Sequence, residues 1–117
     1  MKQADIIKTY RTLESLSSKN LTDEEQWDIF QLRKKLHPHV EFYDERIKMI
    51  RDKYIEFADP NGNISGEPYE MFVNEINELD NMDKELKIDK FKIKLGNTGI
   101  TAMEMEPLDA FIDFVKQ

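Results

Sequence analysis

Apolar residues recur every three or four positions along the central third of the chain, from Thr22 to Phe57. After Leu36 the steps alternate between four and three, which is a seven-residue repeat with two apolar positions. The repeat predicts one helix of roughly 50 Å, at about 1.5 Å per residue, with a narrow apolar seam. The seam consists of Ile29, Leu32, Leu36, Val40, Tyr43, Ile47, Ile50, Tyr54 and Phe57. Because one helix cannot bury this seam alone, the rest of the chain is expected to cover it.

Pro38 lies inside this predicted helix. A proline in a helix interior loses one backbone hydrogen bond and clashes with the preceding turn, at a cost of about 3 kcal/mol. The apolar phase also slips between Leu36 and Val40. We expect a kinked but continuous helix because the repeat resumes at once; the alternative is a break that leaves Trp27 to Leu36 as a separate helix.

Shorter amphipathic segments flank the long helix on both sides. Residues 4–17 place five apolar side chains on one face, and Thr22 to Glu25 has the form of a capping box that would start the long helix. After the turn signal Asp59 to Asn63, a third helix is expected from about Pro68 to Leu79. Both short helices are expected to fold back antiparallel on the long one.

Near the C-terminal end the apolar period changes from helical to two. Phe91, Ile93 and Leu95 alternate with lysines, and a glycine-bounded turn, 96–99, separates them from a second extended stretch. This pattern predicts a β-hairpin with Leu95 opposite Ile100, followed by a short helix from Pro107. Because a two-stranded hairpin is marginally stable alone, its edge is a candidate for binding a second copy or a partner. The candidate partner-binding residues are Phe91, Ile93, Leu95, Ile100, Met103 and Met105.

These elements predict a single domain, residues 1–117, of mainly α (α+β) class. A helical hairpin spans 4–58 and a third helix 67–82, which gives an antiparallel hairpin or three-helix bundle around one long helix. The β-hairpin and a short C-terminal helix occupy 86–117.

The charge distribution narrows the possible partners. Residues 1–57 hold 11 acidic and 11 basic side chains, whereas residues 58–117 hold 13 acidic and 6 basic ones, which accounts for the net charge of −7. A duplex-binding surface would carry the opposite charge, so direct nucleic-acid binding is not expected. No apolar run approaches the ~20 residues of a membrane span, and the chain has no cysteine. We expect a cytoplasmic protein that binds other proteins, and a basic protein surface remains open as a partner.

The segment from Asp59 to Glu70 resembles a calcium-binding loop between two helices. Oxygen-bearing side chains occupy several of the positions that ligate Ca2+ in a helix–loop–helix site. The sixth position, which needs glycine, is Ile64, so the alternative is a polar turn that starts a helix. The candidate ligands are Asp59, Asn61, Asn63, Glu67 and Glu70. No other cofactor is expected, and the absence of a phosphate-binding glycine loop, a nucleophile elbow or a zinc-protease motif argues against an enzyme.

The order of these parts resembles a family of small bacteriophage and prophage proteins of unknown function from Gram-positive bacteria. The resemblance rests on the long helix ending in Lys53-Tyr54, the turn 59–63, the segment 72–79, Phe91-Lys92-Ile93 and the closing run 108–114. It implies a viral origin and a role in the infected host cytoplasm or in the virion, and it assigns no catalytic residues.

Three functions follow from these observations. The first is a non-enzymatic accessory or assembly factor that binds protein, as a homo-oligomer formed through the hairpin edge. The second is an acidic decoy that inhibits a host nucleic-acid-binding enzyme or defence factor. The third is a calcium-stabilised regulatory module.

Overall fold

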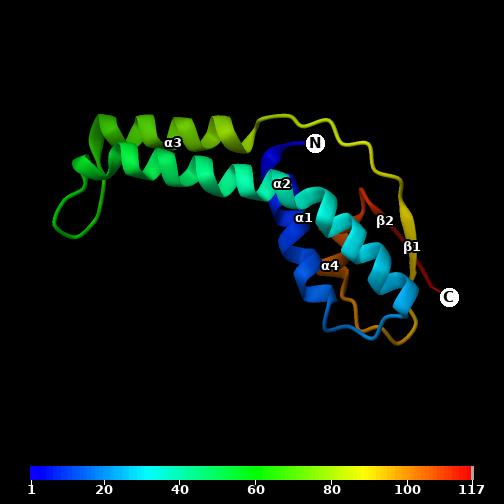
Figure 1. Ribbon diagram of the computed structural model, residues 1–117. Helices are drawn as coiled ribbons and strands as arrows, with labels where there is room; N and C mark the ends of the chain where they lie inside the picture. Colours follow the sequence, from blue (N-terminus) through cyan, green and yellow to red (C-terminus); the bar gives the residue numbers. More distant parts are fainter. Residues whose placement is uncertain (117) are drawn as a thin grey trace.

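The computed structural model describes residues 1–116, which form an elongated α+β molecule of 54 × 29 × 19 Å. Its elements are α1 (Gln3–Leu16), α2 (Asp23–Tyr54), the 3-10 helix η1 (Ile55–Phe57), α3 (Gly66–Asp80), β1 (Phe91–Lys94), α4 (Ala102–Leu108) and β2 (Ile112–Val115). Figure 1 shows a head and an arm. The head comprises α1, the first half of α2, α4 and the two strands, and the arm comprises the second half of α2, η1, the loop 58–65 and α3.

The long helix forms as its apolar repeat and capping signal predict. The side chain of Thr22 accepts a hydrogen bond from the Glu25 backbone N–H at 3.1 Å, and Glu25 Oε1 accepts from the Thr22 N–H at 2.9 Å. Pro38 lies inside α2 without breaking it, and Figure 1 shows the helix bending where it leaves the head. Beside the proline, the buried Gln3 of α1 donates its side-chain amide to the carbonyl of His39 at 2.9 Å. The expectation of a continuous helix is confirmed.

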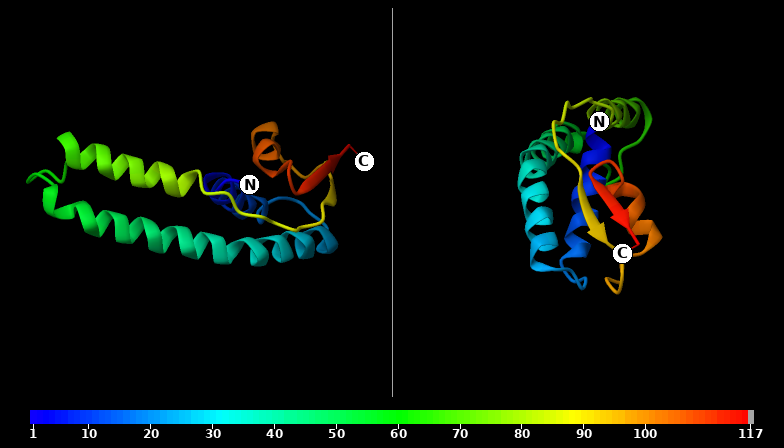
Figure 2. Two further views of the ribbon diagram at one scale, coloured as in Figure 1. Left: turned by 90° about the horizontal axis from the view of Figure 1, so that it is seen from above. Right: turned by 90° about the vertical axis from the view of Figure 1, so that its right-hand side faces the viewer.

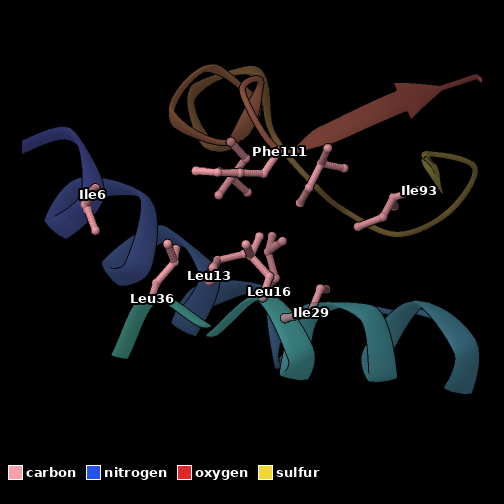
Figure 3. Close-up of a cluster of buried hydrophobic side chains, with 10 residues drawn as sticks. Ile6, Leu13, Leu16, Ile29, Leu36, Ile93 and Phe111 are labelled. Carbon is pink, nitrogen blue, oxygen red and sulfur yellow. The ribbon is translucent and has the colours of Figure 1, made fainter. Parts of the chain in front are cut away.

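The head holds the larger of two apolar cores. Figure 3 shows side chains from α1, α2 and the C-terminal segment converging between these elements. The fully or almost fully buried members are Ile6, Leu13, Leu16, Ile29, Leu32, Leu36, Ile93, Leu108, Phe111 and Ile112. The first half of the predicted seam is therefore covered by α1 and by the C-terminal segment.

The arm has its own smaller core, between the second half of α2 and α3. The two helices run side by side in opposite directions (Figures 1 and 2) and bury Ile50, Tyr54 and Leu79. Polar contacts hold the pair at two places: Tyr43 donates its hydroxyl to Asp80 Oδ1 at 2.8 Å, and Lys53 Nζ lies 3.0 Å from Glu75 Oε1. The second half of the seam is thus covered within the same chain as far as Tyr54, whereas its last predicted member, Phe57, is 50% exposed.

The predicted β-hairpin is wrong. β1 pairs in parallel with β2, with Phe91 opposite Ile112 and Lys94 opposite Val115, and α4 lies between them in the chain. The expected second strand, 100–105, is mostly helical, and the expected C-terminal helix is replaced by β2. The physical reason is a second capping box, in which Thr101 and Glu104 exchange hydrogen bonds. It starts a helix whose first five residues, 102–106, are alanine, methionine and glutamate, all strong helix formers.

One carboxylate connects the start of the long helix to the sheet. Glu25 Oε2 accepts a hydrogen bond from the backbone N–H of Lys94 at 2.9 Å, so the same side chain caps α2 and occupies a backbone donor of the β1 segment. Burial acts to raise the pKa of Glu25, but the hydrogen bonds from the Thr22 and Lys94 backbones outweigh it and lower the pKa below its ordinary value. This contact fixes the sheet at one end of α2.

Candidate functional site

Large apolar side chains are exposed at the end of the arm, where α2 gives way to η1 and the chain turns back into α3. Ile55 is 68% exposed, Phe57 and Tyr69 are each 50% exposed, and Met71 is 49% exposed. Single exposed apolar residues are ordinary on protein surfaces, whereas a group of them at one place is typical of sites that bind proteins, membranes or ligands. We call this region, residues 52–71, the arm tip.

The arm tip contains an open groove of about 410 Å³. Its lining residues are Lys53, Tyr54, Glu56, Phe57, Glu67, Pro68 and Met71. Tyr54 is only 3% exposed, and its ring contacts Phe72 edge-on, with the ring centroids 5.8 Å apart. The buried tyrosine is therefore anchored in the arm core, while Phe57 and Met71 stand exposed beside it.

Local chain geometry creates this groove. The α-helix ends at Tyr54 and tightens into one 3-10 turn, so Phe57 no longer follows the spacing that keeps the seam buried. Gly66 begins α3 with a φ of +70°, a backbone conformation that favours glycine, and Pro68 occupies the first turn of that helix. The two helix ends consequently face each other across a loop of eight residues, 58–65.

The charges around the groove are mainly negative. Lys53, its one basic lining residue, is paired with Glu75, and this hydrogen bond raises the pKa of the lysine. Contact with the Tyr54 hydroxyl and with Lys53 in turn lowers the pKa of Glu75. Within residues 1–116, no ion pair involves the exposed carboxylates of Glu56 or Glu67. The net charge offered to a partner is therefore negative.

The candidate calcium ligands belong to a turn and a helix start. Asp59 Oδ1 accepts the backbone N–H groups of Asn61 and Asn63, each at 2.9 Å, so this carboxylate closes the loop on itself. Glu67 and Glu70 lie in α3 and are exposed. No group of three or more acidic, histidine or cysteine side chains able to hold a metal occurs within residues 1–116. In the structure this segment is a polar turn followed by a helix, and calcium binding at it stays a prediction.

The candidate partner-binding residues of the predicted hairpin lie mostly in the head. Ile93 is fully buried, and Phe91 and Ile100 pack against the same core. Leu95 and Met105 are half-buried, whereas Met103 on α4 is 85% exposed. The edge of an antiparallel hairpin, on which the expected homo-oligomer depended, is not formed.

Sequence patterns identified part of the arm tip as a candidate calcium loop, but they did not identify its exposed apolar surface. Phe57 was assigned to the buried seam because it continues the helical apolar spacing, and Tyr69 falls within the expected third helix. Nothing in that spacing shows that α2 tightens at Ile55, or that α3 leaves Tyr69 uncovered. The exposed side chains at the tip follow from where the two helices end relative to each other.

A smaller exposed pair lies on the head. Trp27 is 59% and Phe30 52% exposed, on the face of α2 opposite the buried Ile29 and Leu32, and their ring centroids are 5.6 Å apart. Their side chains add exposed apolar surface without a groove, since neither lines any of the larger hollows found in residues 1–116. Because no groove within residues 1–116 accompanies it, this pair is not part of the candidate site.

Comparison of the chain with protein-family models, with curated proteins and with solved structures finds no match. Within residues 1–116, no helix is both long enough and apolar enough to cross a membrane.

Proposed function

We propose that this chain is a non-enzymatic, phage-derived protein that binds another protein and acts as an accessory or assembly factor in the infected bacterial cytoplasm. The observation that carries the proposal is the group of exposed apolar side chains at the end of the arm. The arm itself extends away from the head (Figure 1). The phage origin rests on the resemblance of segments such as 59–63 and 72–79 to small phage proteins.

The division of the molecule into head and arm supports a binding role. Each part has its own buried core, and Ile55, Phe57 and Met71 belong to neither of them. Side chains that fold the protein are normally buried, whereas Ile55, Phe57 and Met71 are about half exposed or more and leave apolar surface in water. Such surface is stabilised when a partner covers it.

A second candidate function is an acidic decoy for a basic host enzyme or defence factor. It is favoured by the charge of the arm tip, because residues 52–71 contain five acidic side chains and one lysine. A protein that imitates nucleic acid, however, would depend mainly on its negative charge. The arm tip combines its charge with an apolar groove. We therefore rank the accessory or assembly role first.

Affinity capture from infected and uninfected cells tests the proposal. The full chain is immobilised, and proteins retained from each lysate are identified and then produced in pure form for direct binding measurement. Retention of a virion component that also binds as a purified protein is expected for an accessory factor. Retention of a host nucleic-acid enzyme alone would support the decoy, and turnover of a small molecule by the purified chain would contradict both.

A further inference from the structure

We propose that the arm tip binds a basic amphipathic segment of a partner protein, with the partner's large apolar side chains in the groove and its lysines or arginines against Glu56 and Glu67. This inference rests on the proposed protein-binding function and names the surface and the chemistry of the partner.

The groove has the size and the apolar lining of a site that takes up large side chains. A hollow of about 410 Å³ lies within the range of sites that take up a ligand, and its floor and walls include Tyr54, Phe57 and Met71. Aromatic residues and methionine are enriched where proteins bind one another, and methionine adapts to partners of different shape. The groove therefore suits large aliphatic or aromatic side chains of a short segment.

The charges on the rim of the groove determine which charge a partner should carry. Residues 52–71 carry four of the seven excess negative charges of the whole chain, although they make up about a sixth of its length. Lys53 is occupied by Glu75 at 3.0 Å, which leaves Glu56 and Glu67 as the free charges on the rim of the groove. Complementary rim charges steer a partner and exclude those of like charge, so the favoured segment is basic.

The arm holds this surface in place before binding. The hydrogen bonds to Asp59 close the loop 58–65, and the Tyr43–Asp80 and Lys53–Glu75 contacts fix α3 along α2. A preorganised surface loses less conformational entropy on binding than a flexible one does. The rigid arm is thus consistent with recognition of a short, flexible segment.

A second copy of this chain fits the groove poorly. Two arm tips would bring together two surfaces with an excess of four negative charges each, and such like charges repel at ordinary ionic strength. Anionic membranes and nucleic acids are disfavoured for the same reason. The basic segment is the occupant that satisfies both the groove and its rim.

The experiment uses two methionines as reporters in the full chain. Met71 lies in the groove and Met103 on the head, and both are exposed, so a chain labelled with 13C at the methionine methyl groups reports on each site separately. The probes are a synthetic amphipathic helix of leucine and lysine and a matched helix of leucine and glutamate. We expect the lysine peptide to shift the Met71 signal saturably and to leave Met103 unchanged, and the glutamate peptide to shift neither.

Paired variants separate the apolar and the charged contributions. Phe57→Ala is expected to weaken binding of the lysine peptide about tenfold through lost apolar contact, whereas Trp27→Ala on the head serves as the matched aromatic control and leaves binding unchanged. The double variant Glu56→Lys/Glu67→Lys is expected to weaken binding of the lysine peptide by about tenfold or more. These two positions are exposed and do not contribute to the arm core. Thermal unfolding confirms that each variant is folded.

Several outcomes would overturn the inference. An unmoved Met71 signal, equal shifts at Met71 and Met103, or equal binding of the two peptides would each contradict it. A Met71 signal that moves with protein concentration alone would identify a second copy as the occupant. If Phe57→Ala captured the same partner from lysate as strongly as the unchanged protein, the binding function would stand and the arm tip would be the wrong surface.

Discussion

Glu104 offers the sharpest test of how the head is held together. Its carboxylate accepts the backbone N–H of Thr101 at 2.9 Å and the hydroxyl of Ser15 at 2.8 Å, and it lies 3.2 Å from Lys19 Nζ. The hydrogen bond from the Thr101 backbone contributes most to lowering the pKa of Glu104 from 4.5 to about 2, and burial opposes it. One side chain therefore starts α4 and ties that helix to the end of α1.

The magnitude follows from this lowered pKa. Each pKa unit corresponds to 1.36 kcal/mol, so the full change amounts to about 3 kcal/mol in favour of the folded, ionised state. Because the Glu104 side chain remains 16% exposed, solvent screening reduces the expected contribution to about 2 kcal/mol. Glu104→Gln keeps the size of the side chain and removes the charge, so we expect a loss of about 2 kcal/mol near pH 7.

The pH dependence distinguishes this explanation from lost packing. The folded-state pKa is lower than the unfolded one, so the contribution is fully present above about pH 5.5 and declines as the pH falls below 4.5, where the unfolded chain takes up the proton first. Urea unfolding followed by circular dichroism at about pH 7, 5 and 3.5 measures the free energy of unfolding of both proteins. Their difference should narrow by about 1 kcal/mol or more at the lowest pH.

The matched control is Glu106→Gln on the same helix, because that side chain is exposed and makes no hydrogen bond with residues 1–116. It should change stability by less than about 0.5 kcal/mol. A loss below about 0.5 kcal/mol for Glu104→Gln, or a loss that stays the same at about pH 3.5, would refute the reasoning.

Three further predictions concern other parts of the molecule. Ile93→Ala should cost about 2–5 kcal/mol in urea unfolding, because Ile93 is fully buried in the head, and a loss under 1 kcal/mol would contradict its place there. Asp59→Ala should speed amide hydrogen exchange at Asn61 and Asn63, whose N–H groups lose their acceptor. Added calcium should leave the melting temperature of the unchanged protein as it is, and a calcium-dependent rise would support the calcium-loop hypothesis. Trp27, 59% exposed, should fluoresce like tryptophan in water and be readily quenched by acrylamide, whereas protected emission would show that this face of α2 is covered.

The sheet shows why the C-terminal part of the fold could not be predicted. Parallel pairing of Phe91 with Ile112 joins positions 21 residues apart and depends on α4 crossing between them. Alternation of apolar and polar residues identifies β1 as extended but does not name its partner or its direction. The capping box at Thr101 was a readable local signal against the hairpin, yet the alternation of β1 and the turn 96–99 favoured a second strand after it.

The arm tip shows the same limit at a candidate site. Periodicity places Phe57 and Met71 on or near helices, but exposure depends on where α2 and α3 end relative to each other. The acidic excess of residues 58–117 was visible in the sequence, whereas its meeting with an apolar groove was not.

The sequence by itself determined the long helix, its start at Thr22 and the two helices that flank it, and it favoured continuity through Pro38. Those features depend on hydrogen bonds and side-chain spacing within a few residues of the chain, so local pattern is enough to define them. The tertiary structure alone decided which strand pairs with β1, which side chains of the C-terminal segment enter the head core, and which apolar side chains stay exposed at the arm tip. Each of these depends on contacts between segments distant in the sequence, which no local pattern encodes.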